Sequence, residues 1–171
     1  TIPSRRIRLG AGAVLVLLGF GASIPNAFLS RTQAGEAAAV VNARARSGDV
    51  VAYCPDQLGP SASRLIDPGL TQVTFPRRTD PTFVDWIDYA KVNGAGHASA
   101  FARYVSELAG PSHAIWYVWA PGYKTFGTAC ETIAADLAVM HGPRRTAVVQ
   151  SAPDTAFEIF EGESLYEFGQ P

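Results

Sequence analysis

An uncharged, strongly apolar run near the start of the chain limits what this sequence can fold into. No residue from Leu9 to Leu29 carries a charge, and Ala13–Phe20 is almost entirely aliphatic. A helix of this length spans about 31 Å at ~1.5 Å per residue, which matches the hydrocarbon thickness of a bilayer. The sequence therefore predicts a transmembrane helix with a basic flank within residues 1–30, followed by a separate domain over residues 31–171.

The arginines around this run predict its orientation. Arg5, Arg6 and Arg8 precede it and only Arg31 follows it, so the positive-inside rule places the N-terminus in the cytoplasm and the later domain on the extracytoplasmic side of the cell membrane. Two alternatives remain open. The same layout fits a cleaved signal peptide, with Gly21–Ser23 as a poor cleavage site, or a buried core helix. The chain does not begin with methionine, so it is also compatible with the last span and tail of a multi-span protein.

Charge is distributed unevenly along the chain. The first 31 residues hold four arginines and no acidic residue, whereas the remainder holds ten basic and fifteen acidic residues. A domain with a net charge of about −5 does not attract nucleic acid through its overall charge. The hydrophobic content of 47% also excludes a disordered chain. We therefore expect a lipid bilayer as a partner and no nucleic acid.

Helix and strand patterns alternate after the apolar run. Apolar periodicity and turn residues predict strands over residues 49–54, 70–75, 114–120 and 146–151, and extended structure around residues 157–160. They predict helices over residues 32–46, 61–66, 84–89, 97–109 and 128–141. This alternation is typical of right-handed βαβ crossovers. The expected fold is α/β, a three-layer sandwich with a mostly parallel sheet of about four strands in the order 2-1-3-4.

Two cysteines, Cys54 and Cys130, are far apart in the sequence. In an oxidising compartment an even number of cysteines favours a disulfide. Cys54 ends the first predicted strand and Cys130 begins the helix after the third, so strand order 2-1-3-4 brings both to the carboxyl edge of the sheet. The alternative is that they are two unrelated small buried residues.

Ligands of open α/β sheets bind at the carboxyl edge. The sequence places residues 55–60, 76–93 and 121–127 in loops there. Carboxylates and amides beside aromatic rings suit a carbohydrate, which needs hydrogen-bond partners and a ring to stack on. The candidate ligand-binding residues are Asp56, Gln57, Trp86, Tyr89 and Tyr123. The alternative is that Trp86 and Tyr89 plug the core while the acids are solvated.

No catalytic residue, metal site or cofactor is predicted. The sequence lacks the GxSxG, HExxH and GxxxxGK[ST] motifs, and no GxGxxG follows the first predicted strand. Asp85 and Asp88 form a DxxD pair that is weak evidence for catalysis or metal binding. His97, His113 and His141 lie at element ends without a nearby cysteine to complete a zinc site.

Three segments carry a resemblance to a known family. GDVVAYCPDQLGPSASRL (Gly48–Leu65), VDWIDYAKV (Val84–Val92) and VWAPGYKTFGTACE (Val118–Glu131) resemble the C-terminal extracytoplasmic domain of actinobacterial polytopic membrane glycosyltransferases with C-type architecture, similar to mannosyl- and arabinosyltransferases. The likeness covers nearly the whole chain.

The resemblance implies a parent enzyme that transfers a sugar from a polyprenyl-phosphate donor to an envelope glycan or protein. In that class the catalytic acid lies in the first extracytoplasmic loop, so this chain is expected to bind or position the acceptor glycan without supplying that acid. The alternative is a free-standing, signal-anchored envelope protein that binds or scaffolds without catalysis.

Overall fold

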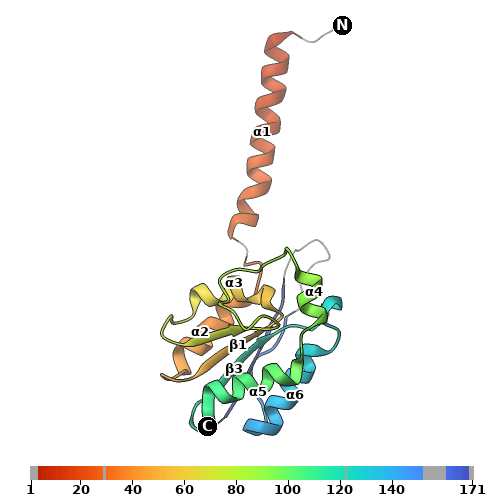
Figure 1. The fold of residues 1–171 in the computed structure, drawn as a ribbon. Coiled ribbons are helices and arrows are strands. Elements are labelled where there is room, and N and C mark those ends of the chain that lie inside the picture. Colours follow the sequence, from red (N-terminus) through yellow and green to blue (C-terminus); the bar gives the residue numbers. More distant parts are fainter. Residues whose placement is uncertain (1–3, 29, 122, 152–160, 170–171) are drawn as a thin grey trace. The chain divides into compact units, whose positions relative to one another are not determined.

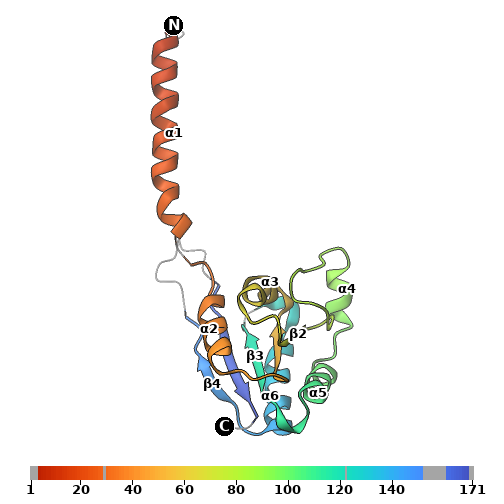
Figure 2. The same ribbon diagram turned by 90° about the vertical axis from the view of Figure 1, so that its left-hand side faces the viewer.

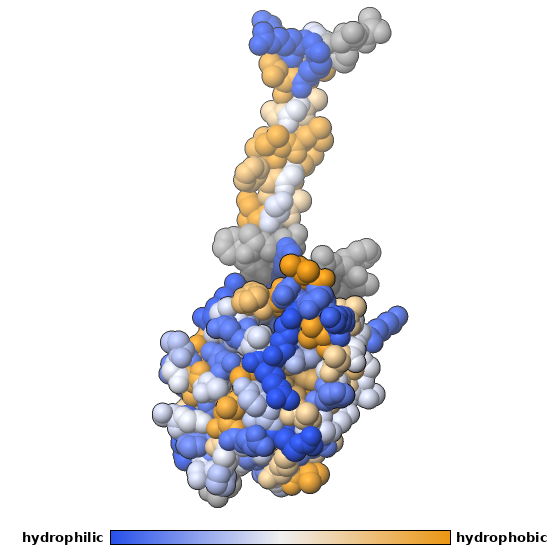
Figure 3. Space-filling view, in the orientation of Figure 1, coloured by the Kyte–Doolittle hydropathy of each residue, from blue (hydrophilic) through white to orange (hydrophobic). Residues whose placement is uncertain are grey.

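The computed structural model describes residues 4–28, 30–121, 123–151 and 161–169 (Figure 1). The chain divides after Arg31 into two compact units. The first unit holds a single helix, α1 (Arg5–Phe28). By length and composition residues Arg5–Ile24 are apolar enough to cross a membrane, and a signal sequence would pass the same test. Figure 3 shows hydrophobic residues along this helix and hydrophilic residues at its start.

The second unit is an α/β domain around a five-stranded mixed sheet. Its strands are β1 (Val50–Cys54), β2 (Thr71–Thr74), β3 (Ile115–Trp119), β4 (Arg145–Val148) and β5 (Ser164–Phe168), in the order β2-β1-β3-β5-β4. β1 pairs in parallel with β2 and β3, whereas β5 runs antiparallel to both β3 and β4. The parallel pairing of the first three strands confirms the predicted crossovers.

The predicted sheet, mostly parallel with about four strands in the order 2-1-3-4, is wrong in its strand count, in its strand order and in its pairing, since two of the four strand pairs are antiparallel. β5 inserts between β3 and β4, which leaves β4 at the edge. All five residues of β5 are buried, as expected for a strand with neighbours on both sides. The chain beyond β4 is long enough to turn back toward β3 and form this antiparallel strand. The extended structure predicted around residues 157–160 lies outside the described residues.

Helices cover both faces of the sheet (Figure 2). The α-helices of the domain are α2 (Ala34–Arg44), α3 (Gly59–Ala62), α4 (Tyr89–Gly94), α5 (Ala98–Ala109) and α6 (Ala129–His141). Short 3-10 turns are η1 (Asp56–Leu58), η2 (Ser63–Leu65), η3 (Gly110–Ser112) and η4 (Lys124–Phe126). The helix predicted over residues 84–89 is displaced, because α4 begins where that prediction ends.

Alternate residues of β1 build the two cores. Val50, Ala52 and Cys54 face α5 and α6, whereas Val51 and Tyr53 face α2 and α3. All five are buried, as the continuous apolar run predicts for a central parallel strand. The resulting three-layer arrangement confirms the predicted α/β sandwich.

The predicted disulfide between Cys54 and Cys130 is present. The two Cα atoms lie 5.5 Å apart, within the usual range for a disulfide. The bond joins the end of β1 to the first turn of α6 across 76 positions of sequence. It therefore fixes two elements that meet at the carboxyl edge of the parallel strands.

Candidate functional site at the carboxyl edge of the sheet

The loops after β1, β2 and β3 all leave the sheet at one edge, because these strands are parallel. Cys54–Pro55 and Phe75–Pro76 are cis peptide bonds, so the first two of these loops each start with a cis proline. The loop after β2 is the longest and leads to α4. The five predicted ligand residues lie in these loops or at the start of α4.

A hydrogen bond and a ring contact join three of these residues. Asp56 is buried, and its Oδ1 accepts a hydrogen bond of 2.9 Å from the Tyr89 hydroxyl. The Tyr89 ring lies 4.7 Å from the Trp86 ring between centroids, and Trp86 is 62% exposed. The structure thus aligns a buried acid, a half-buried phenol and an exposed indole. The alternative prediction, that Trp86 and Tyr89 plug the core while the acids are solvated, holds for Tyr89, which packs against the core, but not for the exposed Trp86 or the buried Asp56.

Asp56 and Tyr89 influence each other's pKa. Burial raises the pKa of the Asp56 carboxyl, although the Tyr89 hydrogen bond and the positive charge of Arg77 oppose this effect. Burial, followed by the negative charge of Asp56, raises the pKa of the Tyr89 hydroxyl. The phenol therefore remains a hydrogen-bond donor to Asp56 at physiological pH.

Gln57 and Tyr123 lie at the margin of this group. The side-chain Oε1 of Gln57 is buried and has no hydrogen-bond partner among the described residues. Tyr123 is half-buried and packs against both cores, and its ring lies 6.5 Å from Phe126. Phe126 in turn lies 6.1 Å from Tyr89. Tyr123 is therefore connected to the Trp86–Tyr89 pair through a shared aromatic neighbour.

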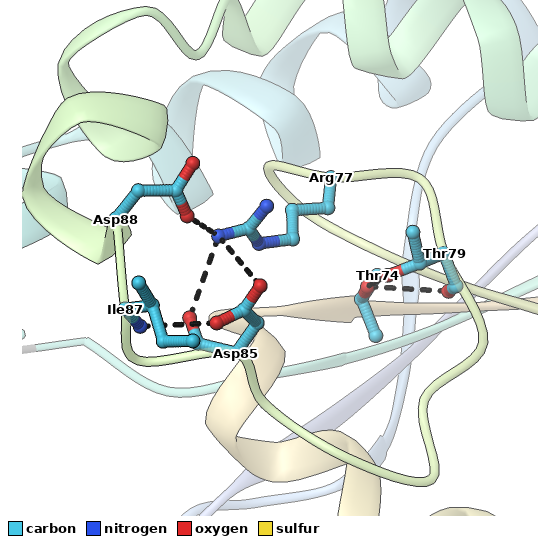
Figure 4. Close-up of polar contacts among 6 residues, drawn as sticks. All are labelled: Thr74, Arg77, Thr79, Asp85, Ile87 and Asp88. Carbon is cyan, nitrogen blue, oxygen red and sulfur yellow. Dashed lines mark hydrogen bonds and ion pairs between the residues drawn. The ribbon is translucent and has the colours of Figure 1, made fainter.

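Arg77 organises the loop after β2 (Figure 4). Its Nη2 atom forms an ion pair with Asp88, lies 3.6 Å from Asp85 Oδ2, and donates to the Asp85 carbonyl oxygen at 3.4 Å. The Arg77 hydrogen bond lowers the pKa of Asp88. The Asp85 Oδ1 atom also accepts a hydrogen bond of 3.0 Å from the Ile87 amide. The DxxD pair is thus a pair of counter-ions for Arg77.

The turn that carries Arg77 is itself closed by hydrogen bonds. The Thr74 amide and hydroxyl donate to the Thr79 carbonyl oxygen at 3.3 and 3.2 Å, and the Arg78 amide donates to the Thr74 carbonyl oxygen at 2.7 Å. Figure 4 shows Thr74 and Thr79 beside the ion pairs. These contacts fix the backbone on both sides of Arg77, just after the end of β2.

Sequence reasoning missed a second group of polar residues, where β5 begins beside the end of β3. Glu163 is fully buried, and its two carboxyl oxygens have no hydrogen-bond partner among the described residues. Burial and the nearby charge of Glu161 raise the pKa of Glu163 to about 8. The Gln33 side chain links the segment after β4 to the segment before β5. Its Oε1 accepts hydrogen bonds from the backbone amides of Ser151 (2.7 Å) and Glu163 (3.1 Å). Its Nε2 donates to the Val149 carbonyl oxygen (3.0 Å).

No motif in the sequence pointed to Glu163, because its burial depends on where β5 inserts. The described residues contain no group of three histidine, cysteine or acidic side chains that could hold a metal. Two of the histidines make local contacts: His141 Nε2 lies 2.8 Å from Ser106 Oγ, and His113 Nδ1 lies 3.0 Å from the Ala109 carbonyl oxygen.

Comparisons with models of known protein families, with curated proteins and with solved structures found no match for this chain.

Proposed function

We propose that residues 32–171 form a membrane-attached domain that binds a carbohydrate at the carboxyl edge of its sheet. In the fuller form of this proposal, the domain positions an envelope glycan acceptor for a membrane glycosyltransferase that uses a polyprenyl-phosphate-linked sugar. The observation that carries the proposal is the exposed Trp86 ring, held against Tyr89 beside hydrogen-bonding groups. A sugar offers a C–H face to an aromatic ring and hydroxyls to polar side chains.

In this proposal the residues of the site have different roles. Asp56 is buried and already accepts the Tyr89 hydroxyl, so its part is to orient the Tyr89 ring that supports Trp86. Trp86 presents the surface on which a sugar ring stacks. Gln57 lies next to Asp56, and its buried Oε1, which has no partner among the described residues, becomes an acceptor for a sugar hydroxyl only when the side chain turns outward. Tyr123 flanks the aromatic group through Phe126.

Attachment and sidedness are part of the same proposal. The length and composition of α1 support a membrane anchor, and the arginines at its start support a cytoplasmic N-terminus. The disulfide between Cys54 and Cys130 supports an oxidising, extracytoplasmic location for the domain.

The test compares Trp86→Ala with Trp86→Phe in binding titrations of the full chain against manno- and arabino-oligosaccharides. Loss of one stacking partner is worth about 1 kcal/mol, so we expect Trp86→Ala to weaken binding about fivefold or more and Trp86→Phe to weaken it less. The melting temperature of both variants should stay near that of the wild type, because Trp86 is exposed. Unchanged affinity of Trp86→Ala, or an equal loss of folding, would refute the proposed role of the ring.

A further inference from the structure

The loop between β2 and α4 exposes three large hydrophobic side chains within five residues. Phe83 is 65% exposed, Trp86 is 62% exposed and Ile87 is 96% exposed. In Figure 3 strongly hydrophobic side chains stand among hydrophilic ones where this loop runs before α4 in Figure 1. Residues 81–88 are called the docking loop below.

The tip of the docking loop is held in place by polar contacts behind it. Asp85 and Asp88, on either side of Trp86 and Ile87, are both paired with Arg77 (Figure 4). The Ile87 amide is satisfied by the Asp85 side chain. Trp86 packs one face of its ring near Tyr89. An ordered turn thus holds an almost fully exposed isoleucine at its tip, and the flanking carboxylates and the Ile87 amide already have partners.

The acidic side chains of the docking loop, Asp85 and Asp88, are both paired with Arg77. Residues 76–91, which include this arginine, carry three basic and three acidic side chains, whereas the domain as a whole is acidic. A neutral segment with exposed aromatic and aliphatic residues is compatible with the headgroup region of a membrane, where tryptophan is enriched.

The short connection between α1 and α2 favours the bilayer as the partner of the docking loop. Five residues separate the end of α1 at Phe28 from the start of α2 at Ala34, so this connection spans at most about 22 Å. α2 begins at the same carboxyl edge, because Gln33 is bonded to residues at the ends of β4 and β5. If α1 spans a bilayer, the length of this connection keeps the start of α2, at that edge of the sheet, within about 22 Å of the end of α1.

We propose that the docking loop inserts Phe83 and Ile87 into the headgroup region of the bilayer that α1 anchors, with Trp86 at the membrane–water interface. This inference does not depend on carbohydrate binding. A Trp86 ring in contact with lipid is not free to stack on a sugar at the same time, so the two proposals assign this ring to alternative partners.

The test uses tryptophan fluorescence of the full chain in nanodiscs of phosphatidylcholine and phosphatidylglycerol, with and without acyl chains brominated near the headgroup. The protein has three tryptophans, and Trp116 and Trp119 are only 1% and 9% exposed, so contact quenching by bromine reports on Trp86. We expect brominated discs to reduce the emission of the wild type. The same discs should leave the emission of Trp86→Phe unchanged.

The deciding variant replaces Phe83 and Ile87 by serine and keeps Trp86. We expect this double variant to lose most of the quenching, while the matched control Val139→Ser, altered at an 85%-exposed residue in the last turn of α6, keeps it. Near-UV circular dichroism checks folding, and Ile87→Ser alone replaces the double variant if that protein is misfolded. Absence of quenching in the wild type, or equal quenching in the double variant, would overturn the proposal. The proposal would also be overturned if the wild type showed no quenching and formed a dimer that the Phe83 and Ile87 substitutions abolish. The partner of the docking loop would then be a second copy of the chain.

Discussion

The buried carboxyl group of Glu163 makes the stability of this domain depend on pH. Its side chain is fully buried, its oxygens have no hydrogen-bond partner among the described residues, and its backbone amide is fixed by Gln33. Burial, followed by the negative charge of Glu161, raises its pKa from 4.5 to about 8. Loss of the proton would leave a negative charge in the interior, next to Tyr53, whose pKa that charge raises.

The sign of the effect follows from proton binding. Between pH 4.5 and about 8 the folded protein keeps a proton on Glu163 that the unfolded chain releases, so the free energy of unfolding decreases as the pH rises. The stabilisation is complete below pH 4.5 and is lost as the pH passes through about 8. At about 1.4 kcal/mol per pH unit the whole effect is about 5 kcal/mol, of which about 3–4 kcal/mol falls between pH 5 and pH 8.

Substitution Glu163→Gln removes the titration while keeping the shape of the side chain. We expect urea unfolding of the full chain in detergent micelles, followed by tryptophan fluorescence, to show a decrease of about 3–4 kcal/mol from pH 5 to pH 8 in the wild type and a much smaller decrease in Glu163→Gln. Glu107→Gln, on the exposed face of α5, should retain the wild-type dependence. A wild type equally stable at both pH values, or a Glu163→Gln variant with an unchanged slope, would refute the reasoning.

Two further predictions concern the bonds at the carboxyl edge. Alkylation of the unreduced protein should find no free thiol at Cys54 or Cys130. Replacing both cysteines by serine should lower the free energy of unfolding, measured by urea titration, by about 4 kcal/mol, because the bond closes a loop of 76 positions. Tyr89→Phe removes the donor to the buried Asp56, so urea titration should show a loss of about 1–3 kcal/mol that is larger at pH 8 than at pH 5, since the pKa of Asp56 would rise further. A loss that does not change with pH would contradict this account of Asp56.

Local sequence patterns were sufficient to predict the parallel half of the domain. The continuous apolar run of β1 and its turn residues specify a central strand, and the strand order that follows brings Cys54 and Cys130 together. Those inferences need only neighbouring residues and the handedness of crossovers. The same reasoning placed Asp56, Trp86 and Tyr89 in loops at one edge, where the structure brings them into contact.

The antiparallel insertion could not be predicted in the same way. The sequence of β5 does not indicate that this strand lies between β3 and β4. The partners of a strand that are distant in sequence depend on how its buried side chains pack against the rest of the sheet and the helices. The burial of Glu163 follows from that insertion. The counter-ion role of Asp85 and Asp88 was missed for a related reason, since it requires Arg77 to be turned toward them by the closed Thr74–Thr79 turn.

The carboxyl edge gathers these features because of how the chain is routed. Each parallel strand ends there and each crossover begins there, while α2 and the antiparallel β5 also start at this edge. Contacts between distant parts of the sequence therefore form at this edge, such as Gln33 with Glu163 and Asp56 with Tyr89, and the disulfide links two of the segments. A surface assembled in this way from separate segments leaves no short motif in the sequence.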